Sequence, residues 1–188
     1  MDDSGFYTGK GDRGDTGRLM SAGRVSKDSA LIEAVGALDE ATSAIGVARA
    51  RCPVVQLQER LAAVQHHLYR LMAHLSAVPE ARQQYPGLRQ AEVDWLEQLI
   101  AQLEADLPSL KDFVLPGDAE DSAALHVARA VVRRAERRLV ALSELEPNVD
   151  QSNLAYINRL SSLMFVAALY VDQSAGRSPS LAKQQYDI

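Results

Sequence analysis

The run from residue 8 to residue 17, TGKGDRGDTG, has the composition of a phosphate-binding loop. It holds four glycines, two basic residues and two threonines within ten positions. Glycine lets backbone N–H groups approach an anion closely, hydroxyls add donors, and lysine or arginine supplies positive charge. Asp12 or Asp15 could hold a divalent cation that bridges phosphate oxygens. The run lacks the Gly-Lys-Ser/Thr ending of a Walker motif, and its composition is equally compatible with a flexible tail.

A second group of charged residues lies on a predicted helix at residues 118–142. Arg129, Arg133 and Glu136 are spaced four and three positions apart, so they share one side of that helix, beside its apolar face. We therefore expect the two guanidinium groups to be partly buried, which strengthens their attraction for anions. The planar fork of arginine suits phosphate or carboxylate, and Glu136 can orient Arg133 by an ion pair. The alternative is a solvated helix with surface ion pairs, which suits the other arginines of this segment.

Small residues form a stripe on the predicted helix at residues 27–51. Gly36, Asp39, Ser43 and Gly46 are three, four and three positions apart, so another helix or a ligand could approach closely around one carboxylate. An Asp in mid-helix has weak helix propensity, which favours a specific partner. The alternative is a stripe that faces water.

The four histidines do not have the spacing of metal ligands. His66, His67, His74 and His126 include no His-x-x-x-His pair, and the chain has no Glu-x-x-His, which argues against a di-iron bundle and a zincin. Phe113 lies in an apolar linker beside a Pro-Gly pair. It is by default a core residue, but an aromatic side chain in a loop is also a good wall for a large planar ligand.

Helices are the elements that must position these side chains. Five segments have apolar residues every three or four positions, which is typical of amphipathic helices. They span residues 27–51, 53–75, 88–107, 118–142 and 147–171. Asp118 is the predicted N-cap of the fourth helix, and Pro147 and Asn148 start the fifth. The sequence therefore predicts an all-α, single-domain five-helix bundle.

The chain divides into three predicted parts. Residues 1–26 form a glycine-rich segment, which is either an ordered loop that could bind the phosphates of a nucleotide or a disordered tail. Residues 27–175 form the bundle, and residues 176–188 form a C-terminal tail. The 188 residues are 47% hydrophobic and 24% charged, which is ordinary for one globular domain.

Charge and cysteine content exclude several classes of function. The formal net charge of -5 provides no overall field that would attract nucleic acid or an anionic membrane. A single cysteine, Cys52, fits a reducing compartment. The N-terminus lacks the apolar core of a signal peptide, and no apolar run approaches the roughly 18 residues needed to cross a bilayer. We expect a cytoplasmic protein without a nucleic-acid or membrane partner.

Taken together, these motifs resemble those of the cobalamin adenosyltransferases of the propanediol-utilisation type. The resemblance extends from about residue 6 to residue 171 and is carried by seven motifs in the expected order. They are YT followed by GDxGxT up to residue 16, RVSK at 24–27, GxxDE at 36–40, QHHLY at 65–69, FVLPG at 113–117, AR through RRAER at 128–137, and NRLS at 158–161.

The resemblance implies a homotrimer whose active sites lie between neighbouring subunits. The enzyme would transfer the 5′-deoxyadenosyl group of ATP to the cobalt of cob(I)alamin and release triphosphate, with Mg²⁺ bound mainly through the ATP phosphates. The residues assigned to ATP are Thr8, Lys10, Gly11, Asp12, Gly14, Asp15, Thr16, Lys27, Arg133, Glu136 and Asn158.

The same resemblance assigns further residues to catalysis and to the corrinoid. Asp39 and Arg129 match a salt bridge across the subunit interface, and Phe113 matches the aromatic residue that presses on the lower face of the corrin. We assign Arg133 with these three to catalysis, and His67 with Phe113 to the corrinoid site. A flavin-dependent reductase and a cobalamin-dependent mutase are candidate partners.

The sequence departs from the family pattern in three places. Residues 17–24 lack the usual paired glycines and contain one extra residue, Thr42 replaces a frequent Asn, and Ser162 replaces a frequent Asp. These departures motivate an alternative function, a catalytically weak or inactive relative that binds ATP or a corrinoid as a sensor or escort. A third alternative is a bundle that only mediates protein interactions.

Overall fold

The structure, a computed structural model, describes residues 9–110, 112–146 and 149–183. These residues form five long α-helices, a short 3-10 helix and two short strands. The elements are β1 Asp15–Gly17, β2 Arg24–Ser26, α1 Ala30–Arg51, α2 Val55–Ser76, η1 Pro79–Gln84, α3 Gln90–Glu104, α4 Glu120–Leu145 and α5 Gln151–Ser174. The five predicted helices are all present, and the predicted break at residues 79–87 contains η1.

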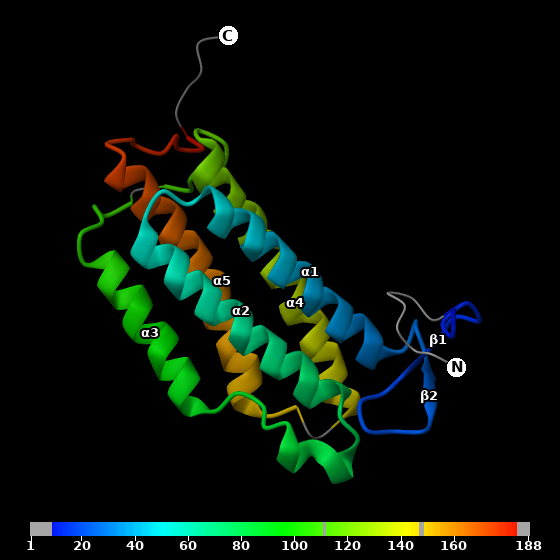
Figure 1. Cartoon of the computed structure of the whole chain (residues 1–188). Helices are drawn as coiled ribbons and strands as arrows, with labels where there is room; N and C mark the ends of the chain where they lie inside the picture. Colours follow the sequence, from blue (N-terminus) through cyan, green and yellow to red (C-terminus); the bar gives the residue numbers. More distant parts are fainter. Residues whose placement is uncertain (1–8, 111, 147–148, 184–188) are drawn as a thin grey trace.

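The five long helices lie side by side around one core (Figure 1). α1 packs against α2 and α4, while α5 packs against α4 and α3. Each helix contributes fully buried leucines from its apolar stripe. Examples are Leu38, Leu68, Leu96, Leu125 and Leu160, each 0% exposed. Removal of this apolar surface from water, at roughly 25 cal/mol per Å², is the main force that holds the bundle together.

The N-terminal segment contains a β-hairpin that the sequence analysis did not predict. β1 and β2 pair antiparallel, with Thr16 opposite Val25. The connection between them is fixed to the end of α2, because the Leu19 N–H donates to the Ser76 carbonyl at 3.1 Å. The hairpin lies at the N-terminal end of α1 (Figure 1). Three-residue strands are too short to show the polar and apolar alternation that predicts a strand.

The connection between the two strands contains a strained turn at Met20. Met20 has a φ of 61°, in the left-handed region that favours glycine. Its side chain is 59% exposed, so packing does not compensate for this conformation. A non-glycine residue in this conformation costs on the order of 1 kcal/mol.

The predicted N-cap of α4 differs from the one in the structure. Asp118 is not the N-cap of α4, because Ala119 occupies that position and makes no side-chain cap. Asp118 instead accepts hydrogen bonds from Ser180, 62 residues away in sequence. The predicted start of the last helix at residues 147–148 lies outside the described residues, and α5 itself begins at Gln151.

Among the described residues, α5 is the one helix that is long and apolar enough to cross a membrane by length and composition. It contains an 18-residue window with a mean hydropathy of 1.4. The sequence analysis had found no run of this kind. In the bundle, 61% of that window is buried, and α5 packs against α3 and α4. Its place in the core therefore accounts for its apolar character.

Candidate functional site

The glycine-rich loop is folded against the start of α1. Lys27 holds it with two hydrogen bonds, from Nζ to the Gly11 carbonyl at 2.9 Å and from its backbone N–H to the Gly14 carbonyl at 2.8 Å. Gly14 has a φ of 80°, which suits glycine. These two bonds hold residues 11 and 14 of the loop against Lys27. Thr8 lies outside the described residues.

Arg24 closes the loop from the other side. Its guanidinium donates to the Lys10 carbonyl at 2.7 Å and to Oδ1 of Asp15 at 2.9 Å. The hydrogen bond from Arg24 holds the pKa of Asp15 below its ordinary value. Asp15 is thus occupied as an ionised carboxylate in shaping the loop, which leaves the exposed Asp12 better placed for a cation. Sequence reasoning missed the role of Arg24, because nothing in its local spacing indicates a contact with Lys10 or Asp15, which lie 14 and 9 positions earlier.

Glu136 on α4 and Asn158 on α5 form a polar pair. Asn158 Nδ2 donates to Glu136 Oε1 at 2.8 Å, so the amide of one helix orients the carboxylate of the other. The predicted ion pair between Glu136 and Arg133 is not present, because Asn158 holds the carboxylate. The structure therefore brings together two of the residues assigned to ATP from separate helices.

Arg133 lies one turn before Glu136 and is exposed, which corrects the prediction that it is partly buried. Its carbonyl accepts a hydrogen bond from Arg137 at 3.0 Å, but in the described part of the chain its guanidinium has no partner. A guanidinium without an internal partner is suited to bind a phosphate oxygen, because all its donors are available.

The glycine-rich loop and the group of Arg133, Glu136 and Asn158, called the Arg133 face below, are two separate parts of the candidate site within one chain. The loop lies at the end of the bundle where α1 begins (Figure 1), whereas Arg133 lies near the middle of α4. Among the described residues, no hydrogen bond or ion pair joins the loop to Arg133, Glu136 or Asn158. A ligand that needs both parts must therefore bridge them, or take one part from each of two copies of the chain.

Asp39 and Arg129 do not contact each other within the chain. Asp39 is exposed on α1 beside the equally exposed Gly36 and Ser43, and across the described ranges its carboxylate has no partner. Arg129 is half-buried, and its buried Nε has no hydrogen-bond partner among the residues that the structure describes. An unpaired buried donor costs roughly 1 to 3 kcal/mol, so this guanidinium is suited to a partner from outside the chain.

Exposed apolar side chains lie on the same two helices. Val47 on α1 is 48% exposed and Val127 on α4 is 60% exposed. They line a hollow of about 410 Å³ between α1 and α4, together with three alanines and two charged residues, Ala44, Ala123, Ala124, Arg51 and Glu120. An apolar hollow on the surface of a monomer is typical of a contact surface.

A larger pocket, of about 500 Å³, lies where the linker before α4 meets α4 and α5. Its lining residues are Leu110, Asp112, Phe113, Val114, His126, Arg129, Phe165 and Lys183. Phe113 is 80% exposed, so the prediction of a core residue is wrong. The structure therefore places two of the predicted catalytic residues, Phe113 and Arg129, in one pocket.

His126 and Phe165 are residues of this pocket that sequence reasoning missed. The two rings pack edge to face with centroids 6.0 Å apart. His126 is 5% exposed, and its Nδ1 has no hydrogen-bond partner. A pocket with aromatic walls and two unpartnered nitrogens can hold a large planar ligand that carries polar groups. The available signal was the three-residue spacing from His126 to Arg129, which places both on one side of α4.

His67 lies apart from this pocket. Its Nδ1 is 2.9 Å from the Tyr156 hydroxyl, and its ring packs edge to face against Trp95 with centroids 5.2 Å apart. His67 is not among the residues that line the pocket with Phe113. Its assignment to a corrinoid stays a prediction, and within the chain it helps join α2, α3 and α5.

The burial of His67 predicts a pH dependence of stability. Burial lowers the pKa of His67, and it also lowers the pKa of His126. The unfolded chain therefore binds protons more readily than the folded chain, and the free energy of unfolding should fall as the pH drops from about 7.5 to about 5.5. Urea unfolding at both pH values should show a smaller loss for His67→Gln than for the wild type. His66→Gln changes an exposed neighbour and should keep the full loss of unfolding free energy. Equal losses in all three proteins would contradict the assignment of this pH dependence to His67.

Similarity to known proteins covers almost the whole chain. The family model for cobalamin adenosyltransferase matches residues 6–171. A corrinoid adenosyltransferase from Bacillus subtilis is 40% identical over 175 residues, which are 91% of this chain and 88% of that protein. One from Mycobacterium tuberculosis is 43% identical over 165 residues, which are 86% of this chain and 85% of that protein.

A solved structure shows the same fold. It is a variant of the PduO-type ATP:corrinoid adenosyltransferase from Lactobacillus reuteri complexed with cobalamin and ATP. It superposes with a TM-score of 0.86 at 30% sequence identity, and the match covers 95% of this chain and 99% of that one. The chain belongs to the cobalamin adenosyltransferase family.

Proposed function

We propose that this chain transfers the 5′-deoxyadenosyl group of ATP to the cobalt of cob(I)alamin and releases triphosphate. The observation that carries the proposal is the guanidinium of Arg133, which has no partner among the described residues, beside the oriented pair of Glu136 and Asn158. Relatives named corrinoid adenosyltransferase, 40 to 43% identical over most of the chain, support the same activity.

The reaction forms one bond and breaks one bond. Cobalt(I) donates its electron pair to C5′ of ATP, the cobalt–carbon bond forms, and the C5′–O5′ bond breaks with its electrons leaving on the triphosphate. Cob(I)alamin is already a strong nucleophile, so the protein need not activate it. The protein must place C5′ beside cobalt and stabilise the charge that develops on the departing oxygen.

The loop and the Arg133 face would share the binding of ATP. Backbone N–H groups of the glycine loop, together with Thr16 and Lys27, would hold phosphate oxygens, while Arg133 would stabilise the charge on the triphosphate. Lys27 Nζ now bonds the Gly11 carbonyl, and it can exchange that acceptor for a phosphate. The residues assigned to ATP remain Thr8, Lys10, Gly11, Asp12, Gly14, Asp15, Thr16, Lys27, Arg133, Glu136 and Asn158.

Mg²⁺ would be held mainly by the ATP phosphates. The described residues contain no group of three or more His, Cys, Asp or Glu side chains that could enclose a metal ion. Mg²⁺ usually keeps several waters and is bound through one or two carboxylates plus substrate phosphates. The exposed Asp12 fits that pattern as an outer ligand, and the bound ion would neutralise phosphate charge.

Phe113 would press on the lower face of the corrin. A lower axial ligand donates electrons to cobalt(II) and makes its reduction to cobalt(I) difficult, so an apolar ring that excludes this ligand should ease the reduction. The high exposure of Phe113 at the mouth of its pocket supports this role, because the ring is available to a ligand.

The working form would be a homotrimer with sites between neighbouring subunits. Asp39 of one subunit would pair with Arg129 of the next, and the apolar hollow between α1 and α4 would be covered by the neighbour. Such contacts would join the loop of one copy to the Arg133 face of another. A cytoplasmic location fits the single cysteine. A flavin-dependent reductase that supplies the reduced corrinoid and a cobalamin-dependent mutase that uses the product are the candidate partners.

An anaerobic assay distinguishes the enzyme from a sensor or escort. The protein is incubated with ATP, Mg²⁺ and cob(I)alamin, and adenosylcobalamin and triphosphate are measured together with the melting temperature. The enzyme should show turnover and ligand-induced stabilisation, because ligands that bind only the folded state raise its stability. Stabilisation by ATP without product would favour the sensor or escort, for which the strained turn at Met20 is the supporting observation.

Gly11→Ala should weaken the use of ATP without unfolding the protein. A Cβ at this position would lie 2.9 Å from Lys27 Nζ, so the flexible lysine must move away from the loop. We expect the KM for ATP to rise by about tenfold and the free energy of unfolding to change by less than about 0.5 kcal/mol. Gly17→Ala is the matched control, because nothing lies within 4 Å of its Cβ position. A wild-type KM in Gly11→Ala would argue against Lys27 as a phosphate ligand.

A further inference from the structure

The segment that carries Phe113 is held by the C-terminal tail, residues 177–183. The Ala182 N–H donates to the Phe113 carbonyl at 2.8 Å, and the Leu115 N–H donates to the Ser180 carbonyl at 2.8 Å. These two bonds form an isolated antiparallel bridge between the tail and the linker before α4. The linker has no helix of its own at this point, so the tail supplies its backbone partner.

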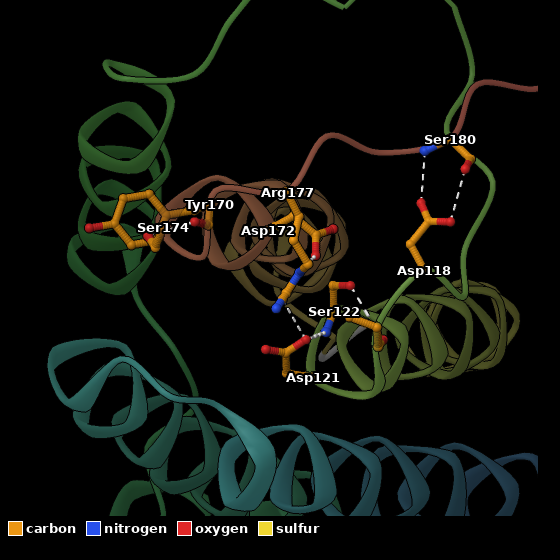
Figure 2. Close-up of polar contacts among 9 residues, drawn as sticks. Asp118, Asp121, Ser122, Tyr170, Asp172, Ser174, Arg177 and Ser180 are labelled. Carbon is orange, nitrogen blue, oxygen red and sulfur yellow. Dashed lines mark hydrogen bonds and ion pairs between the residues drawn. The ribbon is translucent and has the colours of Figure 1, made fainter.

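The tail is anchored in turn to the start of α4. Ser180 donates from its backbone N–H to Asp118 at 2.7 Å and from its hydroxyl at 2.9 Å, as Figure 2 shows. These hydrogen bonds hold the pKa of Asp118 below its ordinary value. The preceding residue, Gly117, has a φ of 128°, a conformation that glycine adopts readily and other residues do not. The turn at Gly117 therefore aims the Asp118 carboxylate at the tail.

A second anchor lies at the end of α5. Arg177 Nε donates to Asp172 at 2.8 Å, and its NH2 group donates to Asp121 of α4 at 2.7 Å (Figure 2). Asp172 is only 3% exposed, so this ion pair is fixed in the bundle. Gly176 has a φ of 69°, and the Arg177 N–H bonds the Asp172 carbonyl at 2.8 Å, which is the pattern of a Schellman helix end. The chain therefore leaves α5 in one direction, toward α4.

We propose that the tail is a clamp that sets the position of Phe113, and that Asp118 and Arg177 are positioning residues for the transfer reaction. The inference rests on the proposed function, because it assumes that Phe113 covers the lower face of the corrin. Packing does not hold the Phe113 ring, which is 80% exposed, so the position of the ring depends on the backbone that carries it, and the two bonds to the tail hold that backbone. Lys183 of the tail also lines the Phe113 pocket. The tail is thus both a wall of the pocket and the support of its exposed aromatic residue.

Two substitutions break the clamp without removing a buried group. Asp118→Ala removes both acceptors for Ser180, and it spares the helix start because Ala119 is the N-cap of α4. Ala182→Pro removes the N–H that bonds the Phe113 carbonyl. Asp118→Asn keeps an acceptor and is the conservative variant, and Ala182→Ser keeps the N–H and is the matched control. Arg177→Ala is less informative, because it leaves a buried carboxylate without its counter-charge.

Three measurements test the clamp. In Asp118→Ala and Ala182→Pro, the Leu115 amide should exchange with solvent at least about tenfold faster, because its bond to Ser180 opens more often. Production of adenosylcobalamin from cob(II)alamin and a chemical reductant should fall by about tenfold to a hundredfold, because a small misplacement of a contact residue is costly. The KM for ATP should stay within about twofold, since the ATP residues lie elsewhere. Asp118→Asn should recover part of the loss, and Ala182→Ser should match the wild type.

The clamp would be overturned if the Leu115 amide exchanged at the wild-type rate in both Asp118→Ala and Ala182→Pro. Faster exchange in these variants with full activity would also overturn it. The clamp would also be overturned if the KM for ATP rose as much as adenosylcobalamin production fell and the melting temperature dropped. That result would describe a general loss of fold. Failure of the proposed function has a different signature. In that case the wild type makes no adenosylcobalamin, while the exchange data still decide whether the tail holds the Phe113 segment.

Discussion

Arg133→Ala should lower kcat/KM for ATP by about a hundredfold to a thousandfold, the usual cost of removing one donor to a developing negative charge. The guanidinium has no partner in the described part of the chain, so its removal breaks no internal contact. It is exposed, and the fold should therefore keep its stability to within about 0.5 kcal/mol. Steady-state kinetics with varied ATP, together with urea unfolding and sedimentation, provide the measurement. Sedimentation should show the wild-type assembly.

Arg138→Ala is the matched control for this prediction. Arg138 lies on the same helix, and its ion pair with Glu33 at 3.0 Å is half-exposed on both sides. A surface pair of this kind is worth about 0 to 1 kcal/mol, so activity should stay within about twofold of the wild type. Comparable losses in both variants would mean that the arginines of α4 act through their summed charge, and the specific role of Arg133 would be wrong.

Charge reversal at Asp39 should dissociate the assembly and abolish activity, and a second reversal at Arg129 should restore both. Asp39→Arg would face Arg129 of a neighbouring subunit, and like charges at an interface cost several kcal/mol. Arg129→Asp should fail in the same way, while the double variant should recover the pair with opposite polarity. We expect each single variant to lose at least about a hundredfold in activity, since half of every site would be missing. Sedimentation velocity and turnover are measured on the same samples.

Glu33→Arg is the control for charge reversal on α1. Glu33 pairs within its own chain with Arg138, so its reversal should leave assembly intact. The prediction fails if Asp39→Arg forms the wild-type assembly, or if the double variant shows no recovery of either property. Dissociation with full activity would locate the whole site in one subunit and would remove the need for a neighbour.

The helices could be predicted from the sequence because each one buries a single stripe. Leucines such as Leu38 and Leu160 recur at helical spacing and are fully buried, so periodicity and burial agree. The β-hairpin could not be predicted, because three residues per strand show no alternation and the pairing depends on the contact of Leu19 with the end of α2. The Asp118 prediction failed because its partner, Ser180, is 62 positions away.

The site was predictable in its residue types and less so in its arrangement. Spacing placed Arg129 and Arg133 on α4 beside apolar residues, but burial also depends on what covers the helix, and Arg133 is uncovered in one chain. The pocket that unites Phe113 with Arg129 also contains His126, which was considered only as a metal ligand. Contacts between the linker, α4 and the tail join segments without any shared periodic pattern, so only the structure reveals them.

The central claim is that the carbon bound to cobalt comes from C5′ of ATP while the triphosphate leaves intact. ATP labelled with carbon-13 at C5′ should be incubated anaerobically with the protein, Mg²⁺ and cob(I)alamin, and the products analysed by mass spectrometry and NMR. The account predicts adenosylcobalamin with the label on the cobalt-bound carbon, and one unbroken triphosphate for each molecule formed. Release of ADP and phosphate, or an unlabelled corrinoid after complete consumption of ATP, would contradict it.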